Sequence, residues 1–496
     1  MPVSSLPGAY GIGCFSKEAY EFVDFLAKTK TRYWQILPLG QTSYGDSPYQ
    51  SFSTFAGNPY FIDLNELIAK GFLKKTECDG ADFGDNEEYI DYGIMYESRY
   101  AILRKAFKRA VKKSLVEDRD FLKFKKKNVE WLFDYALFMA LKDAHGGASW
   151  DEWEDELRMR EKEALEAAAG IYAIDIEFYS WLQYLFYTQW KALKKYANKA
   201  GVKIIGDIPI YVSFDSSDAW ANPELFWFDA DRRPVRVAGC PPDSFAKEGQ
   251  LWGNPLYDWK YHESTGYQWW IKRMKSCGKL YDMVRIDHFR GFDEYYTIPY
   301  GDENAVNGEW VKGPGYALFE AVKAKLGDID VIVEDLGFIT DSVRRLVKKT
   351  GWPNMKIIEF GFGGGDDTGK NEYLTCNYDK NCVVYTGTHD NDTLEGWHKE
   401  ADSKDIAKAV SYLGLNDNEG FVWGTLRGGM SSVANLFVAQ MQDYLGLDSG
   451  ARINTPGKVD GNWQWRVLPN FLSPELAESI RQLADVYQRL PSEEEE

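Results

Sequence analysis

VRIDHFRG, residues 284–291, is the stretch from which the fold can be inferred. Apolar and charged residues alternate here, which is typical of a short strand with one packed face and one polar face. Arg285 and Asp287 are two positions apart and project from the same face. A charge on an inward strand face is costly unless it is paired or used. The two residues are therefore either a structural ion pair at a strand end or part of a functional site.

A helix, a glycine and a short apolar strand recur along the chain around this stretch. We expect strands near residues 33–40, 202–208, 283–287, 331–334, 356–360 and 382–385. Repeated helix, glycine and strand units predict a parallel sheet. Because polar residues cluster at the carboxyl ends of many of these strands, an α/β fold of the (β/α)8 TIM-barrel type is favoured over a doubly wound sheet.

The pattern also predicts how the chain is divided. Residues 1–63 and 201–490 are expected to form the catalytic barrel, and the helical pattern of residues 64–200 predicts a large, mainly helical insertion. Basic residues between 103 and 128 follow a helical period, and acidic segments nearby favour a solvated helix face over a nucleic-acid site. Residues 491–496 are expected to be an acidic tail.

Composition limits the partners of the protein. The chain has 496 residues and a net charge of −18, which argues against nucleic acid, anionic membranes and anionic substrates as partners. No run of 18 apolar residues and no signal-peptide pattern is present. Six scattered cysteines suit reduced thiols, so we expect a cytoplasmic protein. The 18 Trp and 31 Tyr residues offer flat apolar faces with polar edges, which suit sugar rings.

Four successive strand ends carry carboxylates, namely GDIP (206–209), RIDH (285–288), VEDLG (333–337) and GTHDND (387–392). Gathered in one barrel mouth they would repel one another, so they are expected to perform chemistry or to hold a cation.

With five His and no His-x-His or His-Glu-x-x-His, metal catalysis is disfavoured, and we expect no metal or cofactor. GFGGGDD (361–367) lacks the Lys-Ser/Thr of a phosphate cradle and is interpreted as a loop. Glycosyl transfer needs only carboxylates and a neutral substrate.

VRIDHFRG, VEDLG and THDND, in that order, resemble the amylomaltases, the 4-α-glucanotransferases also called disproportionating enzymes, within the α-amylase clan. Further matching segments are SSLPGAYGIG (4–13), LPLGQTSYGDSPYQSFSTFAGNP (37–59), GDIPIYV (206–212), GCPPDSFAKEGQLWGNPLY (239–257) and RINTPGKVDGNWQWR (452–466). The resemblance spans essentially the whole chain. One segment departs from it, since Thr375-Cys376 stands where the family usually has Pro-His.

The resemblance implies a retaining enzyme acting on α-1,4-glucans such as maltooligosaccharides and fragments of starch or glycogen. Asp287 is then the nucleophile, Glu334 the acid/base and Asp390 the transition-state stabiliser, with Asp287 and Glu334 about 5–5.5 Å apart. The residues themselves agree in part. The Arg285 cation should keep Asp287 ionised, and the apolar run 331–333 should raise the pKa of Glu334.

Two neighbouring carboxylates need separate treatment. Asp335 is expected to point to the opposite face from Glu334 and to be structural. Asp392 shares a face with Asp390, and only the resemblance selects Asp390.

A second set of residues is expected to bind the glucan. His288 and His389 adjoin the two catalytic Asp residues and are interpreted as donors to glucose hydroxyls, with a core or capping role as the alternative. Residues 211–260 are expected to be a loop insertion that covers the active site. The substrate-binding set comprises Arg285, His288, His389, Asp243, Gln250, Trp252, Asp207, Asn454 and, as acceptor-side or secondary glucan contacts, Tyr44, Ser47 and Tyr49.

Transfer and hydrolysis use the same carboxylates. Loops that exclude water from the glycosyl-enzyme favour attack by a sugar hydroxyl, and the preference for transfer rests on the resemblance. The alternatives are an α-1,4-glucan hydrolase of the α-amylase type and a non-catalytic glucan-binding protein, against which the intact acidic set argues. The sequence leaves the oligomeric state undetermined.

Overall fold

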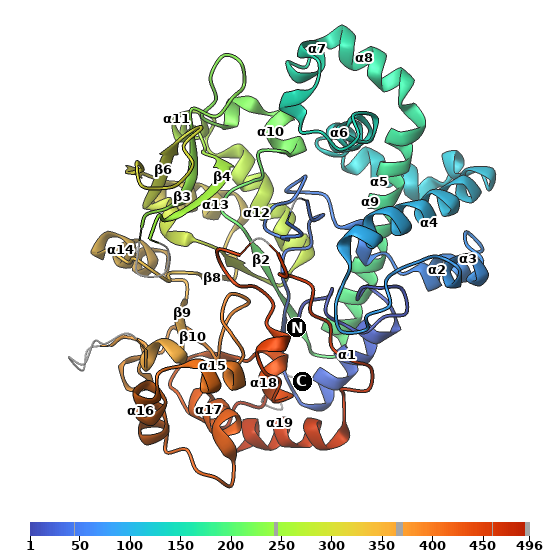
Figure 1. Cartoon of the computed structure of the whole chain (residues 1–496). Helices are drawn as coiled ribbons and strands as arrows, with labels where there is room; N and C mark the ends of the chain where they lie inside the picture. The colour runs from blue at the N-terminus through green and yellow to red at the C-terminus, as the bar shows by residue number, and fades with distance from the viewer. Residues whose placement is uncertain (44, 243–246, 364–370, 459, 492–496) are drawn as a thin grey trace.

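The computed structural model describes residues 1–43, 45–242, 247–363, 371–458 and 460–491. Within these residues a parallel sheet of seven strands forms the centre of the molecule (Figure 1). In spatial order its strands are β1 (Tyr33–Gln35), β2 (Lys203–Ile208), β5 (Met283–Ile286), β8 (Val331–Val333), β9 (Asn354–Ile357), β10 (Cys382–Tyr385) and β11 (Leu436–Val438). Each neighbouring pair is parallel.

The sheet curls into a barrel that is nearly closed. In the part of the chain that the structure describes, β1 and β11 do not pair, and a cavity of about 280 Å³ lined by both strands lies between them. Met1 also lines this cavity, and its carbonyl accepts a hydrogen bond from Trp34 Nε1 at 2.7 Å. The barrel class predicted from the sequence is confirmed, with seven paired strands and an open seam between β1 and β11.

One predicted strand begins two residues and ends three residues too far along the chain. We expected residues 356–360, whereas β9 ends at Ile357 and a short 3-10 turn covers Glu359–Gly361. Ile358 and Phe362 are apolar because they pack in a separate cluster on the helical side of the sheet, with Leu413 among its members. Apolar residues alone do not distinguish these two environments.

Helices surround the barrel strands. They are α1 (Lys17–Lys28), α12 (Gln268–Leu280), α13 (Tyr316–Leu326), α14 (Asp341–Thr350), α15 (Leu394–Glu400), α16 (Ser403–Leu413), α17 (Gly420–Met430), α18 (Met441–Tyr444) and α19 (Pro474–Val486). The short helix α11 (Trp259–Ser264) precedes α12 and contacts residues 223–225. Gly327 and Gly351 end α13 and α14 with positive φ angles of 77° and 75°, as the glycine pattern predicted.

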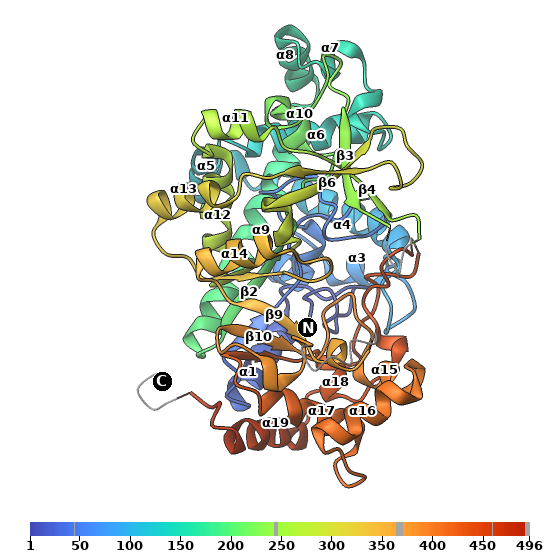
Figure 2. The ribbon, with the colours of Figure 1, turned by 90° about the vertical axis from the view of Figure 1, so that its left-hand side faces the viewer.

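A second, antiparallel sheet was not predicted. In the described chain it contains four strands in the order β4 (Gln250–Pro255), β3 (Arg236–Cys240), β6 (Glu294–Pro299) and β7 (Glu309–Lys312). Figures 1 and 2 both place it on the upper part of the molecule, away from α17 and α19. Because β6 begins a few residues after β5 ends, this sheet stands next to the carboxyl end of β5. The short helix α10 (Ser217–Ala221) precedes it.

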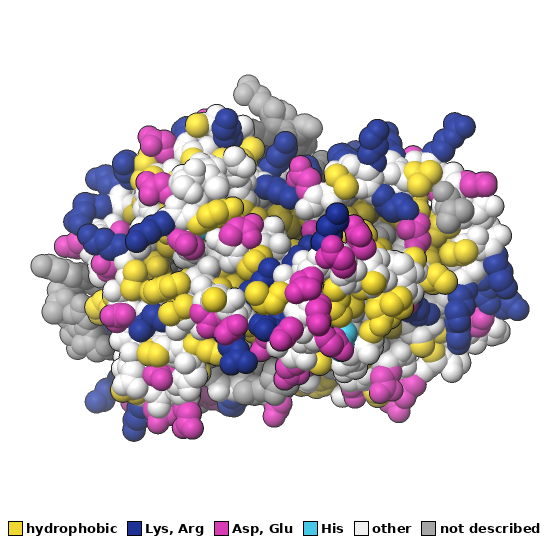
Figure 3. Space-filling model, turned by 90° about the horizontal axis from the view of Figure 1, so that it is seen from above, with side chains coloured by type: hydrophobic (Ala, Val, Ile, Leu, Met, Phe, Trp, Pro, Cys, Tyr) yellow, Lys and Arg dark blue, Asp and Glu magenta, His cyan; other side chains and the backbone are white. Residues whose placement is uncertain are grey.

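Residues 64–200 are mostly helical, as expected, and contain α2 (Leu64–Ala69), α3 (Lys75–Asp79), α4 (Tyr92–Lys112), α5 (Arg119–Lys127), α6 (Leu132–Ala144), α7 (Asp155–Arg158), α8 (Lys162–Ile171) and α9 (Ala173–Lys199). Basic residues of this region pair with acids: Arg109 contacts Glu77 at 2.6 Å and Lys125 contacts Glu177 at 2.8 Å. Figure 3 shows acidic and basic side chains interspersed over the face seen from above. No described helix is long and apolar enough to cross a membrane.

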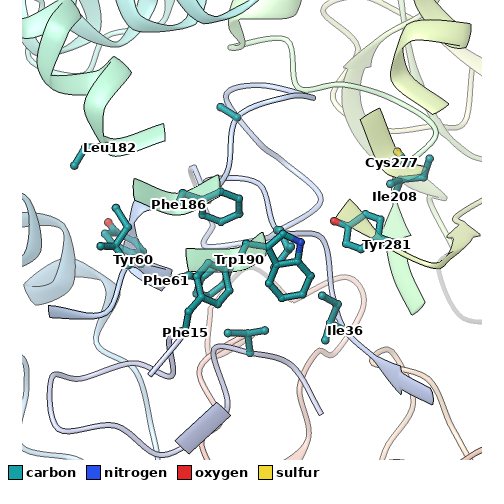
Figure 4. Close-up of a cluster of buried hydrophobic side chains, with 14 of the residues drawn as sticks. Phe15, Ile36, Tyr60, Phe61, Leu182, Phe186, Trp190, Ile208, Cys277 and Tyr281 are labelled. Carbon is teal, nitrogen blue, oxygen red and sulfur yellow. The ribbon is translucent and has the colours of Figure 1, made fainter. Parts of the chain in front are cut away.

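The long helix α9 joins the helical region to the barrel. Phe186 and Trp190 on this helix contact Phe15 of the N-terminal segment, with ring centroids 5.3 and 5.2 Å away (Figure 4). Ile36 and Tyr281 lie in the same buried cluster. The predicted division of the chain at residues 64 and 200 stays a prediction, since α9 packs against α1 and β2 as well as α6.

The same helix fixes the loop that follows β1. Gln183 on α9 accepts a hydrogen bond from Gly57 N at 2.7 Å and donates one to Gly57 O at 2.9 Å. A Cβ at position 57 would lie 2.1 Å from the Phe186 ring, so only glycine fits there. The loop from residue 42 to residue 58 therefore has a fixed end against α9.

Replacing Gln183 by Leu keeps the volume and removes both hydrogen bonds to the buried Gly57 peptide. We expect the free energy of unfolding to fall by about 2–6 kcal/mol, because each of the two unsatisfied buried groups costs about 1–3 kcal/mol. Urea denaturation measures this, with Lys191→Ala on the exposed side of α9 as the control. A Gln183→Leu protein as stable as the wild type contradicts the anchoring role.

Candidate active site

Arg285 connects the ends of two neighbouring strands. Its Nη1 lies 2.9 and 2.7 Å from the two oxygens of Asp207 and 3.0 Å from Asp287 Oδ1. Asp207 on β2 and Arg285 on β5 are register partners, and their side chains are only 1% and 2% exposed. The side chain of Asp287 is 26% exposed. Arg285 and Asp207 thus form a buried ion pair, and Asp287 is its member closest to solvent.

Glu334, directly after β8, reaches the backbone beside Asp287. Its Oε2 accepts from the N–H of His288 at 2.6 Å, and its Oε1 accepts from the N–H of Leu336 at 2.7 Å. His288 has a left-handed backbone with φ 49°, which turns the chain sharply after Asp287. The two carboxyl groups therefore lie at adjacent strand ends. Asp287 is held by Arg285 of its own strand, and Glu334 by backbone N–H groups of the turn after β5 and of its own turn.

Burial raises the pKa of both Asp287 and Glu334 above the ordinary value of a carboxyl. The Arg285 guanidinium lowers the pKa of Asp287, as expected, but this effect is smaller than the effect of burial. For Glu334 the negative charge of Asp287 raises the pKa further, while Arg285 and the two backbone N–H groups lower it. The raised pKa of Glu334 agrees with the expectation from the apolar run before it. Because Arg285 hydrogen-bonds directly to Asp287 while Glu334 has neutral donors, a proton shared by the two resides on Glu334.

Asp390 forms an ion pair with its neighbour. Its Oδ2 lies 3.3 Å from His389 Nε2, and its Oδ1 accepts a hydrogen bond from the Asn454 amide. Enclosure raises the pKa of Asp390, but His389 and Asn454 outweigh it and lower the pKa to about 2. Burial lowers the pKa of His389, and Asp390 reverses this, so that the net shift is upward. Asp390 is therefore ionised over the whole range in which the protein is expected to act.

The two neighbouring carboxylates have other partners. Asp392 accepts from Ser449 Oγ at 2.8 Å and from Thr393 N at 2.7 Å. Asp335 accepts from Asn354 Nδ2 at 2.9 Å and from Met355 N at 3.1 Å. The structure thus separates Asp390 from Asp392, which periodicity alone left equivalent.

The second sheet contributes to the same site. Trp252 on β4 meets His288 edge to face with ring centroids 4.9 Å apart, and its Nε1 donates to Gln250 Oε1 at 3.0 Å. Burial lowers the pKa of His288 to about 3, and its Nε2 has no hydrogen-bond partner among the described residues. His288 is thus a neutral imidazole beside Asp287, with a buried ring nitrogen that has unused hydrogen-bonding capacity.

The early loop lies partly at the site. The Tyr49 hydroxyl donates to Asp207 Oδ2 at 3.0 Å and lies 3.2 Å from His389 Nδ1. Ser47 Oγ accepts from Tyr49 N at 3.2 Å and so shapes the turn before it. Tyr44 and Asp243 lie outside the described residues. We had expected Tyr49 among acceptor-side or secondary glucan contacts, whereas its hydroxyl lies between Asp207 and His389.

Sequence reasoning overlooked two residues of the C-terminal segment. Arg452 donates to the Asp390 carbonyl at 2.7 Å and to the Asn454 carbonyl at 2.8 Å. The Trp463 ring lies 5.6 Å from His389 and 5.7 Å from Tyr49. Both belong to the matched segment 452–466, so their presence beside Asn454 in that motif was the available signal. Among the described residues, no group of three or more His, Cys, Asp or Glu side chains is arranged to hold a metal ion.

Known proteins match this chain over nearly its whole length. A family model described as 4-alpha-glucanotransferase matches residues 1–471. The chain belongs to the 4-α-glucanotransferase family. A 4-alpha-glucanotransferase of Clostridium butyricum is 51% identical over 491 residues, covering 99% of this chain and 100% of that one. One from Thermus thermophilus is 46% identical, covering 98% and 97% of the two chains. The solved amylomaltase of Streptococcus agalactiae in complex with acarbose superposes with a TM-score of 0.95 at 42% identity, covering 99% of each chain.

The resemblance seen in the sequence is thereby confirmed. The family match and the curated relatives favour a glucanotransferase over the hydrolase that was the alternative.

Replacing Arg285 by Met leaves Asp207 and Asp287 without their cation. We expect the free energy of unfolding at neutral pH to fall by about 3–5 kcal/mol, as for other broken buried pairs. The pKa of Asp287 rises further in the folded variant because the guanidinium that lowers it is gone, so folding takes up protons and the loss of stability shrinks as the pH falls.

Denaturation curves across a pH series measure this loss. Arg104→Met is the matched control, because Arg104 also pairs with two carboxylates, Asp143 and Asp175, but is 28% exposed. A deficit that is equal for both variants, or independent of pH, contradicts the role given to Arg285.

Proposed function

We propose that this protein is a retaining 4-α-glucanotransferase that transfers α-1,4-glucan segments to the 4-hydroxyl of an acceptor glucan or glucose through a covalent glucosyl-enzyme intermediate. The observation that carries this is the pair of carboxyls at adjacent strand ends, Asp287 held by Arg285 and Glu334 held by backbone N–H groups. A nucleophile and an acid/base that flank one bond are what double displacement requires.

In the first step Asp287 acts as the nucleophile. Arg285 holds its Oδ1, which leaves Oδ2 to form a bond with C1 of the glucose on the donor side. The proton on Glu334 passes to the glycosidic oxygen as the C1–O bond breaks, and the shortened glucan leaves. The product is a β-linked glucosyl ester of Asp287.

In the second step Glu334 acts as the base. As a carboxylate it takes the proton from the 4-hydroxyl of the acceptor while that oxygen attacks C1 and the bond to Asp287 breaks. Two inversions restore the α-linkage. The raised pKa of Glu334 suits it to both directions of proton transfer.

Asp390 stabilises the positive charge that develops on the glucose ring in both steps. Its ion pair with His389 and its hydrogen bond from Asn454 keep it ionised and in place, so no reorganisation accompanies the reaction. His288, with its free Nε2, and Trp252 are proposed to bind the glucose unit next to Asp287. The other predicted glucan contacts remain part of this proposal: Asp207, Arg285, His389, Gln250, Asn454, Asp243, Tyr44, Ser47 and Tyr49.

The partners of this site follow from its chemistry. The substrates we propose are neutral α-1,4-glucans, that is, maltooligosaccharides and fragments of starch or glycogen, without a metal ion or cofactor. The acidic net charge of −18 supports a neutral substrate over a nucleic acid or an anionic membrane. A cytoplasmic location is proposed on the cysteine usage alone.

Incubation with maltotriose tests transfer directly. We expect a ladder of longer oligosaccharides together with free glucose. Chromatography measures both products over time. Asp287→Asn should reduce the rate by about a thousandfold or more without loss of the fold. Asp335→Asn is the matched control, since that carboxylate faces Asn354 and Met355. Only maltose and glucose as products would identify a hydrolase, and near wild-type turnover by Asp287→Asn rejects the nucleophile.

The pH dependence of kcat/KM reports the two carboxyls. Activity needs Asp287 ionised and Glu334 protonated, so it falls as the pH drops through the pKa of Asp287 and as it rises through that of Glu334. Because the pKa values of Asp287 and Glu334 are both raised, the bell-shaped pH profile of kcat/KM is centred at a higher pH than a pair of carboxyls with ordinary pKa values would give. With a glucosyl fluoride donor, whose leaving group needs no acid, Glu334→Gln should still release fluoride and lose the alkaline limb. An alkaline limb unchanged in that variant contradicts the role of Glu334.

A further inference from the structure

An unbroken chain of polar contacts joins the proposed transition-state stabiliser to the proposed nucleophile. Its members, in order, are Asp390, His389, Tyr49, Asp207, Arg285 and Asp287. Five of the six are ionisable groups of a carboxylate, imidazole or guanidinium type. Tyr49 is the one phenol among them, and it sits at the middle of the chain.

The chain crosses the open side of the barrel. His389 follows β10, Asp207 is on β2, and Tyr49 belongs to the loop after β1. Between β10 and β2 lie β11 and β1, which do not pair in the described part of the chain. The Tyr49 hydroxyl therefore connects the two halves of the site at the place where the sheet has no backbone hydrogen bonds of its own.

The single hydrogen of this hydroxyl determines the protonation of its neighbours. Asp207 pairs with Arg285 and is a carboxylate, so it accepts the hydrogen of Tyr49, with Oδ2 3.0 Å from the hydroxyl. Burial and the charge of Asp207 raise the pKa of Tyr49 well above its ordinary value, so it stays a phenol. Its oxygen can then only accept from His389 Nδ1, at 3.2 Å.

With Nδ1 as a donor to Tyr49, His389 presents its other nitrogen to a carboxylate. Nε2 lies 3.3 Å from Asp390 Oδ2. An imidazole that donates from both nitrogens is a cation. The other charged groups that face His389 are Asp207 on β2 and Arg285 on β5, which act in opposite directions on its pKa, and Asp287, whose own pKa is lowered by His389.

We propose that Tyr49 is a positioning residue that holds His389 in its doubly protonated form. His389 in turn fixes Asp390 as an ion-paired carboxylate, at a set position relative to Asp287 across the seam of the barrel. This rests on the proposed function for the roles of Asp390 and Asp287. Tyr49 acts through His389, apart from any contact its ring makes with a glucan.

Aromatic packing supports a fixed hydroxyl. The Tyr49 ring stacks on the His389 ring with centroids 4.9 Å apart and planes at 26°. Trp463 closes the cluster and adopts a left-handed backbone with φ 66°, uncommon for a bulky residue. Since Phe at position 49 keeps these ring contacts, the substitution removes the hydroxyl alone.

Tyr49→Phe and imidazole NMR of the full chain test the proposal. The chain has five histidines, so the His389 signals can be assigned with a His389→Gln variant. We expect the pKa of His389 to fall by about one unit in Tyr49→Phe. Because one unit is a factor of about ten in the protonated fraction, kcat for maltotriose should fall roughly tenfold above that pKa and recover toward acid pH, with KM little changed.

Tyr296→Phe is the matched control, because that buried hydroxyl also makes a hydrogen bond, to the Ala305 carbonyl at 3.0 Å, in the second sheet. It should lower the melting temperature to a similar extent and leave the His389 titration unchanged. An unchanged His389 pKa with an unchanged pH profile in Tyr49→Phe overturns the proposal.

The imidazole NMR spectrum of the wild-type protein is a second test, and it needs no Tyr49 variant. Both ring N–H signals of His389 should be present at neutral pH, and a neutral tautomer there overturns the proposal even where Tyr49→Phe fails to fold. These titrations use no substrate. A shift of His389 in a protein without transferase activity would therefore refute the proposed function while leaving the positioning role intact.

Discussion

The buried contact of Arg285 with Asp207 and Asp287 is the constraint on which the rest of the site depends. Charges that are almost fully enclosed persist only when they are paired and hydrogen-bonded. Here one guanidinium nitrogen serves both carboxylates, and the two strands that carry them are register partners in the parallel sheet. The position of Asp287 is thus set by the barrel itself, with only its outer edge left for a substrate.

The loop after β1 and the C-terminal segment bring polar and aromatic side chains to the open seam of the seven-stranded barrel. The loop after β1 is held by Gln183 of α9 and delivers Tyr49 to the seam. The C-terminal segment crosses above β10 and delivers Asn454 and Trp463 to Asp390 and His389. The helical region is therefore connected to the chemistry through the two hydrogen bonds of Gln183, and the chain end through those of Asn454 and Arg452. Neither carries one of the three proposed catalytic residues.

Much of this could be predicted from the sequence because it is local. An alternating strand that ends in Asp287, and an apolar strand that ends in Glu334, identify themselves by period and by the residues that follow. The contact between Tyr49 and His389 joins residues 340 positions apart and leaves no periodic signal. Residues 211–260 were expected to be a covering loop, and two of the four strands of the antiparallel sheet, β3 and β4, lie within them. The resemblance alone selected Asp390 over Asp392, because the partner that separates them in the structure, Ser449, belongs to a distant segment.

The most direct test of the account is to trap the glycosyl-enzyme. The Glu334→Gln variant, given a fluorinated glucosyl fluoride that reacts in the first step and is slow in the second, is digested and its peptides are sequenced by mass spectrometry. The account predicts one added glucosyl residue, bonded to Asp287 and absent from Asp287→Asn. A label on another side chain, or turnover of the natural donor with inversion at C1, would contradict it.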